Sequence, residues 1–127
     1  MTIYFFGGKR IVNTLEELKS VLDIRSENDS NEFLLSGNSK YPYLSIMING
    51  NVATAIYFSD DTDVLFQSIG GELGLNMDKT TVFFTGTKEQ EICVWNEYVI
   101  SIEKATEIAI EFFLKHDLPK CVKWSEE

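Results

Sequence analysis

The dipeptide Asn49-Gly50 constrains the fold of this chain more than any other feature of its sequence. It separates two β-rich runs, residues 43–49 and 51–58. Asn and Gly tolerate the positive φ angles that both central residues of a type I′ turn adopt, and this turn matches the twist of paired strands. The sequence therefore predicts a β-hairpin that turns at Asn49 and Gly50. Pro42 is expected at the entry of the hairpin, because proline has no N–H to donate to a neighbouring strand and is tolerated at the edge.

Side chains on the two strands of this hairpin alternate between faces. One face of the first strand carries Leu44, Ile46 and Ile48. One face of the second strand carries Val52, Ile56 and Phe58, with Thr54 as a polar exception. Further β-rich runs bounded by turn residues predict strands at residues 2–6, 32–36, 64–69, 80–85, 91–95 and 121–124.

Two amphipathic helices are also predicted. Thr14 begins a Thr-x-x-Glu capping box, and leucines recur behind it at helical spacing, which indicates a helix over about residues 14–24. A wide apolar stripe near the C-terminus indicates a second helix over about residues 102–115. We expect this helix to bury Ala105, Ile108, Ala109, Phe112 and Phe113 against the sheet.

These elements define an α+β fold, with a mostly antiparallel sheet of about 5–7 strands and two helices packed against it. A length of 127 residues suits a single domain over residues 1–127. No apolar run approaches ~18 residues, so no membrane-spanning segment is expected. The two cysteines are too few for a disulfide framework, and no signal peptide is evident, so a cytoplasmic location is expected.

The charge is strongly acidic. Twenty Asp and Glu residues against eleven Lys and Arg residues give a net charge of −9. Such a chain is repelled by nucleic acid and anionic membranes, and it attracts basic partners. Solubility alone is the alternative explanation for the charge. The excess is concentrated in residues 59–91, where seven acids and two bases give a net charge of −5.

Residues 59–91 are also rich in turn-forming residues, and charged loops on a rigid scaffold are common recognition sites. The candidate contacts for a basic partner are Asp60, Asp61, Asp63, Glu72, Glu89, Glu91 and the strand-end Trp95. A solvated turn or a cation site remains an alternative for the three aspartates, although they lack the glycine and distal glutamate of a calcium loop. A second candidate is the acidic helix face of Glu103, Glu107 and Glu111.

Catalytic patterns are missing from the sequence. There is one histidine, His116, and the two cysteines, Cys93 and Cys121, are too far apart for a Cys-x-x-Cys metal motif. The glycine-rich stretch 70–74 lacks the Lys-Ser/Thr of a phosphate-binding loop and is interpreted as a flexible turn. We therefore expect no enzyme activity, no metal and no cofactor, with Cys93 as a buried core thiol.

Two tryptophans, Trp95 and Trp124, each end a predicted strand. Burial in the core is the more common outcome for this residue type. Tryptophan at a strand end can also anchor a protein interface. Core packing is the prediction for both, with an interface role as the alternative for Trp95.

Several motifs occur in an order that resembles a known protein family. They are Pro42-Tyr43-Leu44, the hairpin through Asn49-Gly50, Gly70-Gly71, the strand to Trp95, Val99-Ile100-Ser101, a helix with Ala105 and Phe112, then Pro119 and Val122-x-Trp124. This ordered set resembles the immunity proteins of bacterial polymorphic toxin systems, specifically the family encoded beside deaminase-type toxins. The resemblance covers about residues 33–125, and its most characteristic part is the C-terminal one.

The resemblance implies a non-enzymatic antitoxin, used in competition between bacteria, that binds a cognate toxin domain and blocks its active site. The implied toxin is a nucleic-acid cytidine deaminase with a basic cleft, and the antitoxin itself contacts no nucleic acid. The acidic charge is consistent with such a partner. Two alternatives remain at this point: a small ligand-binding domain that uses the region from Asp60 to Glu72, and an oligomerising structural module that uses a hairpin edge.

Overall fold

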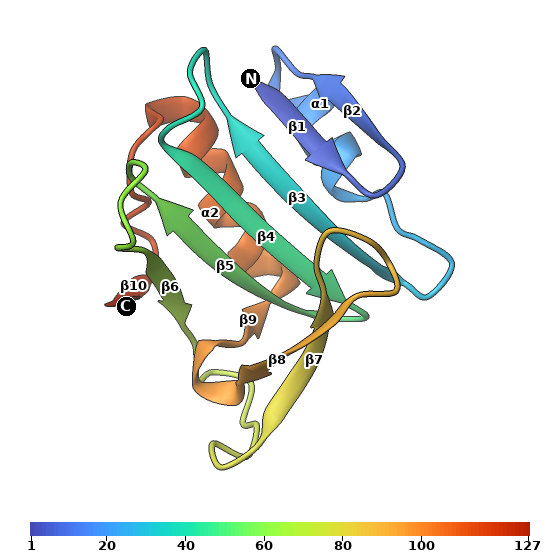
Figure 1. Cartoon of the computed structure of the whole chain (residues 1–127), viewed down its shortest axis with the longest axis vertical. Coiled ribbons are helices and arrows are strands. Elements are labelled where there is room, and N and C mark those ends of the chain that lie inside the picture. The colour runs from blue at the N-terminus through green and yellow to red at the C-terminus, as the bar shows by residue number, and fades with distance from the viewer.

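The structure is a computed structural model that describes residues 1–127 (Figure 1). Its helices are α1 (Leu15–Leu22), α2 (Ile102–Lys115) and the short 3-10 helix η1 (Asn96–Tyr98). Its strands are β1 (Thr2–Phe5), β2 (Gly8–Ile11), β3 (Ser30–Ser36), β4 (Tyr43–Asn49), β5 (Val52–Phe58), β6 (Phe66–Ile69), β7 (Thr80–Phe84), β8 (Glu91–Trp95), β9 (Ile100–Ser101) and β10 (Lys123–Glu126).

The strands form two sheets, and all neighbouring strands are antiparallel. The larger sheet has eight strands in the order β10-β6-β5-β4-β3-β1-β2, and β9 pairs with the beginning of β5. The smaller sheet is the β7–β8 hairpin alone. The α+β prediction with two helices is therefore confirmed, although the sheets contain more strands than expected.

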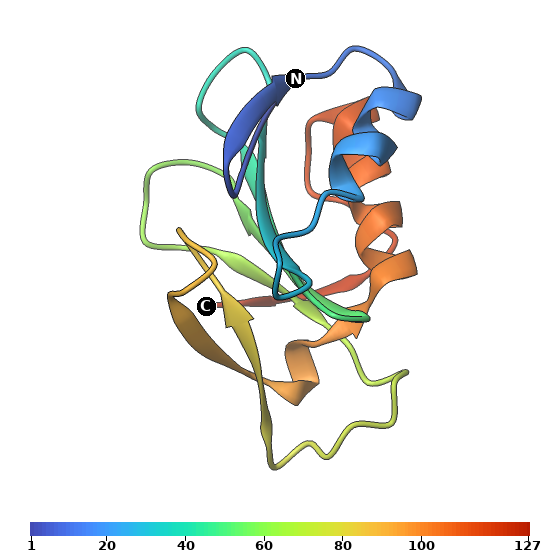
Figure 2. The same cartoon turned by 90° about the vertical axis from the view of Figure 1, so that its right-hand side faces the viewer.

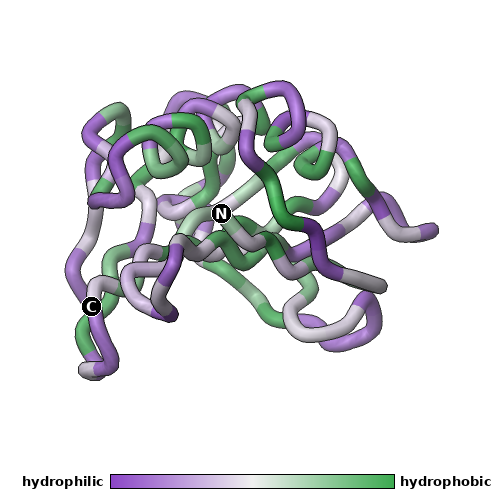
Figure 3. The backbone as a smooth tube through the Cα atoms, turned by 90° about the horizontal axis from the view of Figure 1, so that it is seen from above, coloured by the Kyte–Doolittle hydropathy of each residue, from purple (hydrophilic) through white to green (hydrophobic).

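The molecule has three layers. Figure 2 shows α1 and α2 on one face of the large sheet and the β7–β8 hairpin on the other. In the view from above, apolar segments lie mainly along the strands and polar segments gather in the peripheral loops (Figure 3). The hairpin covers only part of its face, and the part of this face that it leaves uncovered is called the open face below.

The main core lies between the helices and the large sheet. Its strand residues are Ile3, Phe33, Leu35, Leu44, Ile46, Ile48, Ala53, Ala55, Tyr57 and Ile100. Its helix residues include Leu18, Val21, Leu22, Ala105, Ile108, Ala109 and Phe112. A smaller cluster, Met47, Phe83, Val94 and Val99, seals the contact between the sheet and the β7–β8 hairpin. The two central strands are thus buried on both faces, which explains their nearly continuous apolar sequence.

The central hairpin is confirmed, but its turn lies one residue later than predicted. Asn49 pairs with Val52, so the two loop residues are Gly50 and Asn51. Gly50 has a φ of +61°, whereas Asn51 is outside the left-handed region, which fits a type II′ turn with glycine first. Asn49 instead uses its side-chain amide, which donates to the Val82 carbonyl at 2.9 Å and ties the turn to β7.

The face of β5 that joins the main core is the one with alanines. Ala53, Ala55 and Tyr57 point toward the helices, while Val52 and Ile56 pack against the β7–β8 cluster. The hydroxyl of Thr54 on that second side donates to the Tyr98 carbonyl at 2.9 Å, so the polar exception is satisfied.

Both predicted helices form, and local hydrogen bonds explain where they begin and end. α1 starts after Thr14, whose hydroxyl accepts from the Glu17 N–H at 3.1 Å, and it ends two residues earlier than predicted. The hydroxyl of Ser101 caps α2 by accepting from the Lys104 N–H. α2 ends at His116, which has a φ of +52° and donates its N–H to the Phe112 carbonyl at 2.7 Å. Phe113 was expected in the core and is only partly buried.

The C-terminal segment folds back onto the sheet. β10 pairs with β6, two residues later in the chain than the predicted strand 121–124. The indole N–H of Trp124 donates to the carbonyl of the buried Pro119 at 2.6 Å, and its ring lies beside Tyr57. Trp124 is only partly buried, and it packs against the main core from outside, so the prediction of core packing is met in part.

Candidate interaction surfaces

The acidic residues predicted to contact a partner lie in three separate places. Asp60, Asp61 and Asp63 lie in the loop between β5 and β6, and all three are exposed. This loop, green in Figure 2, projects from the sheet on the side of β7–β8, away from the helices. The side-chain and backbone hydrogen bonds from Thr62 lower the pKa of Asp60, so this carboxylate stays ionised well below neutral pH.

Glu72 is not near these aspartates. It follows β6, whereas Asp60, Asp61 and Asp63 precede it, so the two groups lie at opposite ends of that strand. The hydrogen bond that the Lys104 ammonium donates to Glu107 is the largest cause of the raised pKa of that lysine, and Glu72 lies close enough to Lys104 to add to it. It therefore belongs to the end of the molecule where α2 begins.

Glu89 and Glu91 lie at the tip of the β7–β8 hairpin and just after it. This tip is fixed to the β3 side of the molecule. Lys88 forms an ion pair with Glu27, and the Asn28 side chain donates to the Lys88 carbonyl at 2.9 Å. These contacts hold the backbone of the tip in place beside β3, and the carboxylates of Glu89 and Glu91 remain exposed.

The carboxylate of Glu32 on β3 also binds the hairpin. It accepts from the Gly86 N–H at 2.8 Å, from the Thr85 hydroxyl at 2.9 Å and from the Ser45 hydroxyl at 3.2 Å. Hydrogen bonds to an ionised acceptor are stronger than neutral ones. Glu32 therefore joins β3, β4 and the hairpin tip, and it sets the spacing between them.

The expectations of core packing for Trp95 and Cys93 are wrong. On β8, Ile92 and Val94 face the sheet, and the strand alternation turns Cys93 and Trp95 outward. Trp95 is 53% exposed, and Cys93 is exposed as well. A two-stranded hairpin has nothing on its outer side to cover such residues. Trp95 thus remains available as an interface residue.

A groove on the open face was not among the predicted sites. It has a volume of about 320 Å³ and lies between the sheet and the hairpin tip, with Leu34, Tyr43 and Phe58 among its lining residues and Glu32 and Gly86 at the hairpin side. The rings of Tyr43 and Phe58 are stacked, with centroids 4.3 Å apart. One feature of the sequence could have indicated this groove. Strands β4 and β5 carry apolar side chains on both faces, and helices on one side of the sheet cover only one of these faces.

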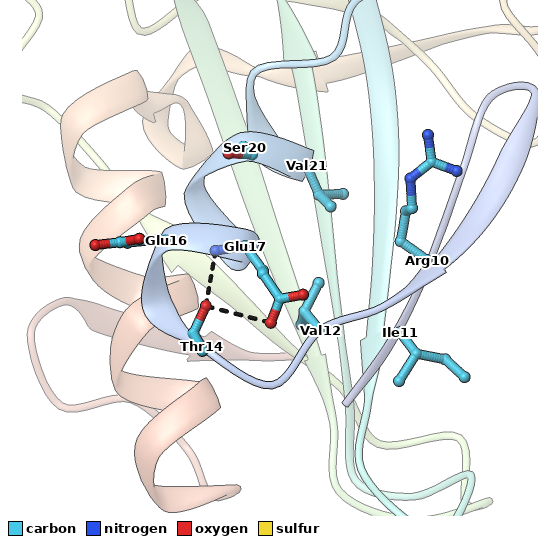
Figure 4. A pocket seen from close by; sticks show the side chains of 8 residues that line it. All are labelled: Arg10, Ile11, Val12, Thr14, Glu16, Glu17, Ser20 and Val21. Carbon is cyan, nitrogen blue, oxygen red and sulfur yellow. Dashed lines mark hydrogen bonds between the residues drawn. The ribbon is translucent and has the colours of Figure 1, made fainter.

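A second depression lies between β2 and α1 (Figure 4). Its polar residues Thr14 and Glu17 point toward one another, because they form the capping hydrogen bonds of α1. Glu17 also accepts from the Asn13 N–H at 3.0 Å. These groups are engaged in starting a helix, and the depression brings together no acid, base and nucleophile.

Other chemical groups are dispersed. No cluster of three or more His, Cys, Asp or Glu side chains lies where it could hold a metal ion. The single histidine, His116, lies at the end of α2 against Gly37 and Phe112. No helix of the structure has the length and apolar character needed to cross a membrane.

The fold and its surfaces define a small acidic α+β protein whose exposed aromatic and carboxylate groups suit contact with another macromolecule. No family model matches the chain. The chain is similar to a double-stranded DNA deaminase immunity protein from Burkholderia cenocepacia (strain H111), with 27% identity over 122 residues, which covers 95% of each protein. This similarity confirms the resemblance to the immunity proteins associated with deaminase-type toxins.

Proposed function

We propose that this protein is an immunity protein that binds a deaminase-type toxin domain and blocks its active site. The observation that carries the proposal is the similarity to a deaminase immunity protein along 95% of both chains. A match of this extent covers nearly all of the chain, and so most of its sheet and helices. It therefore supports a shared role of the whole fold and not of one motif.

The charge supports the same role. A toxin that acts on nucleic acid needs a basic cleft to hold its substrate. A partner with a net charge of −9 is attracted to such a cleft and competes with nucleic acid for it. Electrostatic attraction also speeds association, which suits a protein that must capture a toxin before the toxin reaches DNA. The protein acts by occupancy, without catalysis or cofactor, in the cytoplasm where the nucleic acid lies.

The experiment is to express the toxin domain encoded beside this gene in bacteria, with and without this protein. We expect the toxin alone to stop growth and to leave deaminated bases in the DNA, and co-expression to restore growth and remove the deamination. A catalytically inactive toxin domain should co-purify with the protein. Toxicity that persists despite abundant folded protein would contradict the proposal.

A further inference from the structure

We infer that the groove on the open face binds an arginine-bearing segment of the toxin domain, an inference that rests on the proposed function. Two features line it, the stacked rings of Tyr43 and Phe58 and the hairpin tip fixed by Glu32, and the acidic β5–β6 loop begins at the residue after Phe58. They come from parts of the chain far apart in sequence, and the folded sheet brings them to one face.

The floor of the groove is aromatic and apolar. Phe58 is the last residue of β5 and pairs with Tyr43, the first residue of β4. Leu34 lies on the same face of β3 as Tyr4, its neighbour on β1, which is 49% exposed. No helix covers these side chains, because both helices pack on the opposite face (Figure 2). Leu34, Tyr43 and Phe58 are half-buried and Tyr4 is exposed, and adjoining apolar side chains of this kind are found at interaction sites.

The carboxylate that lines the groove itself is Glu32. The loop that begins directly after Phe58 adds Asp60, Asp61 and Asp63 and no basic residue. On the hairpin side the chain carries Glu89 and Glu91, and Lys88 between the strands is already paired with Glu27. Two lysines lie on the same face: Lys40 shares a depression with Leu34 and Tyr43 and lies over the ring of Tyr41, and Lys9 lies over the ring of Tyr4.

Arginine is the side chain that matches this combination. Its planar guanidinium stacks on aromatic rings and donates paired hydrogen bonds to carboxylates, which the compact ammonium of lysine does less well. A guanidinium stacked on the side of the Phe58 ring that Tyr43 does not cover would lie beside the β5–β6 loop, which begins at the next residue. A nucleic acid would be repelled by the same carboxylates, so the groove suits a basic protein segment.

The test compares two pairs of matched variants for binding to the inactive toxin domain encoded beside this gene. Leu34→Arg places a cation on the groove floor, and Leu114→Arg makes the same change on α2, where Leu114 is 63% exposed on the helix side.

The triple variant Asp60→Asn, Asp61→Asn, Asp63→Asn removes three charges from the loop. Its control removes three exposed charges outside the candidate surfaces, by the changes Glu16→Gln, Asp23→Asn and Asp78→Asn. Melting curves establish that each variant is folded.

We expect Leu34→Arg and the aspartate triple variant to weaken binding on the order of 10- to 100-fold, as for close interfacial charges, and both controls to bind like the wild type. Complex formation should also protect at least one toxin arginine from phenylglyoxal, as mapped by mass spectrometry. Unchanged binding by both groove variants, or no protected arginine, would overturn this inference. Failure of the wild-type protein itself to bind would overturn the proposed function instead.

Discussion

Gly70 shows how one residue without a side chain sets the spacing between β6 and the segment that leads into α2. A Cβ atom built at this position would lie 1.8 Å from the Val99 carbonyl oxygen. The Gly70 N–H donates to the Glu97 carbonyl at 2.7 Å, so the two backbones are held in contact. The sequence suggested a flexible glycine turn here, but this residue is fixed by a close backbone approach.

Gly70→Ala should therefore lower the free energy of unfolding by about 3 kcal/mol, at the upper end of the usual cost of overpacking. The backbone of β6 or of residues 97–99 has to move, because a carbonyl group cannot rotate away like a side chain. Chemical denaturation measures the change. Gly8→Ala is the control, since its added methyl would meet only the Phe5 ring at 3.4 Å. Equal stability of the two variants would contradict the close approach.

Tyr57 links the core to pH. Burial raises the pKa of its hydroxyl above the ordinary value of 10.0, and the nearby Asp117 carboxylate raises it further. The folded protein then holds this proton more tightly than the unfolded chain does. The stabilisation is fully present below about pH 10 and is lost as the pH rises through the higher folded pKa.

Tyr57→Phe should weaken this alkaline loss of stability. Near pH 7 the free energy of unfolding should stay within about 1 kcal/mol of the wild type, because the only hydrogen bond removed is the long one, 3.5 Å, that the Tyr57 hydroxyl donates to Asp117. Denaturation curves at several pH values between neutral and alkaline conditions measure both effects. Tyr43 and Tyr98, whose pKa values burial also raises, keep their own contribution in the variant. An identical alkaline slope for both proteins would refute the role of Tyr57.

At the scale of elements, α2 is the longer of the two helices that cover the main core. Its Ala105, Ile108, Ala109 and Phe112 are all buried, and they face the strand residues of the main core. The ring of Phe112 meets Tyr57 edge to face, with centroids 6.2 Å apart. The helix thus packs through one stripe, and its glutamates lie outside that stripe.

Phe112→Ala should cost about 3–5 kcal/mol of unfolding free energy, the usual range for large aromatic truncations in a core. The ring is fully buried, so its removal leaves a cavity between α2 and the sheet. Thermal melting measures the loss. Leu114→Ala on the same helix should change little, because Leu114 is largely exposed. A melting temperature unchanged by Phe112→Ala would show that α2 is not packed as described.

The elements that sequence reasoning predicted well are those with strong local patterns. The central hairpin has a turn dipeptide, and each helix has a cap and an apolar stripe. β9 has only two residues and forms because it pairs with β5, about fifty residues earlier in the chain. β2 was missed as well, since its sequence Gly-Lys-Arg-Ile has no alternating pattern and all four residues are exposed.

The candidate surface was only partly predictable for the same reason. Composition identified the acidic stretch, and the structure divides it among three places because β6 separates Asp63 from Glu72 and the β7–β8 hairpin folds back over the sheet. The groove beside Tyr43 and Phe58 depends on which face of the sheet the helices cover. The local pattern shows that the hairpin strands have two apolar faces, but long-range packing decides which face the helices cover.

At the scale of the whole molecule, the two faces of the large sheet are unlike. One is buried under α1 and α2 and provides the main core. The other carries the β7–β8 hairpin, the acidic β5–β6 loop and the exposed aromatic residues. This asymmetry suits a protein in which one side gives stability and the other side is free to meet a basic partner.

The most direct test of the proposed function is to titrate this protein into a deamination assay that contains the deaminase-type toxin domain and its nucleic-acid substrate. A tight inhibitor that covers the active site should abolish deamination as the two proteins reach equal concentration. Raising the salt concentration should slow its association, because exposed charges steer the encounter. Deamination that continues unchanged in an excess of the folded protein would contradict the proposed function.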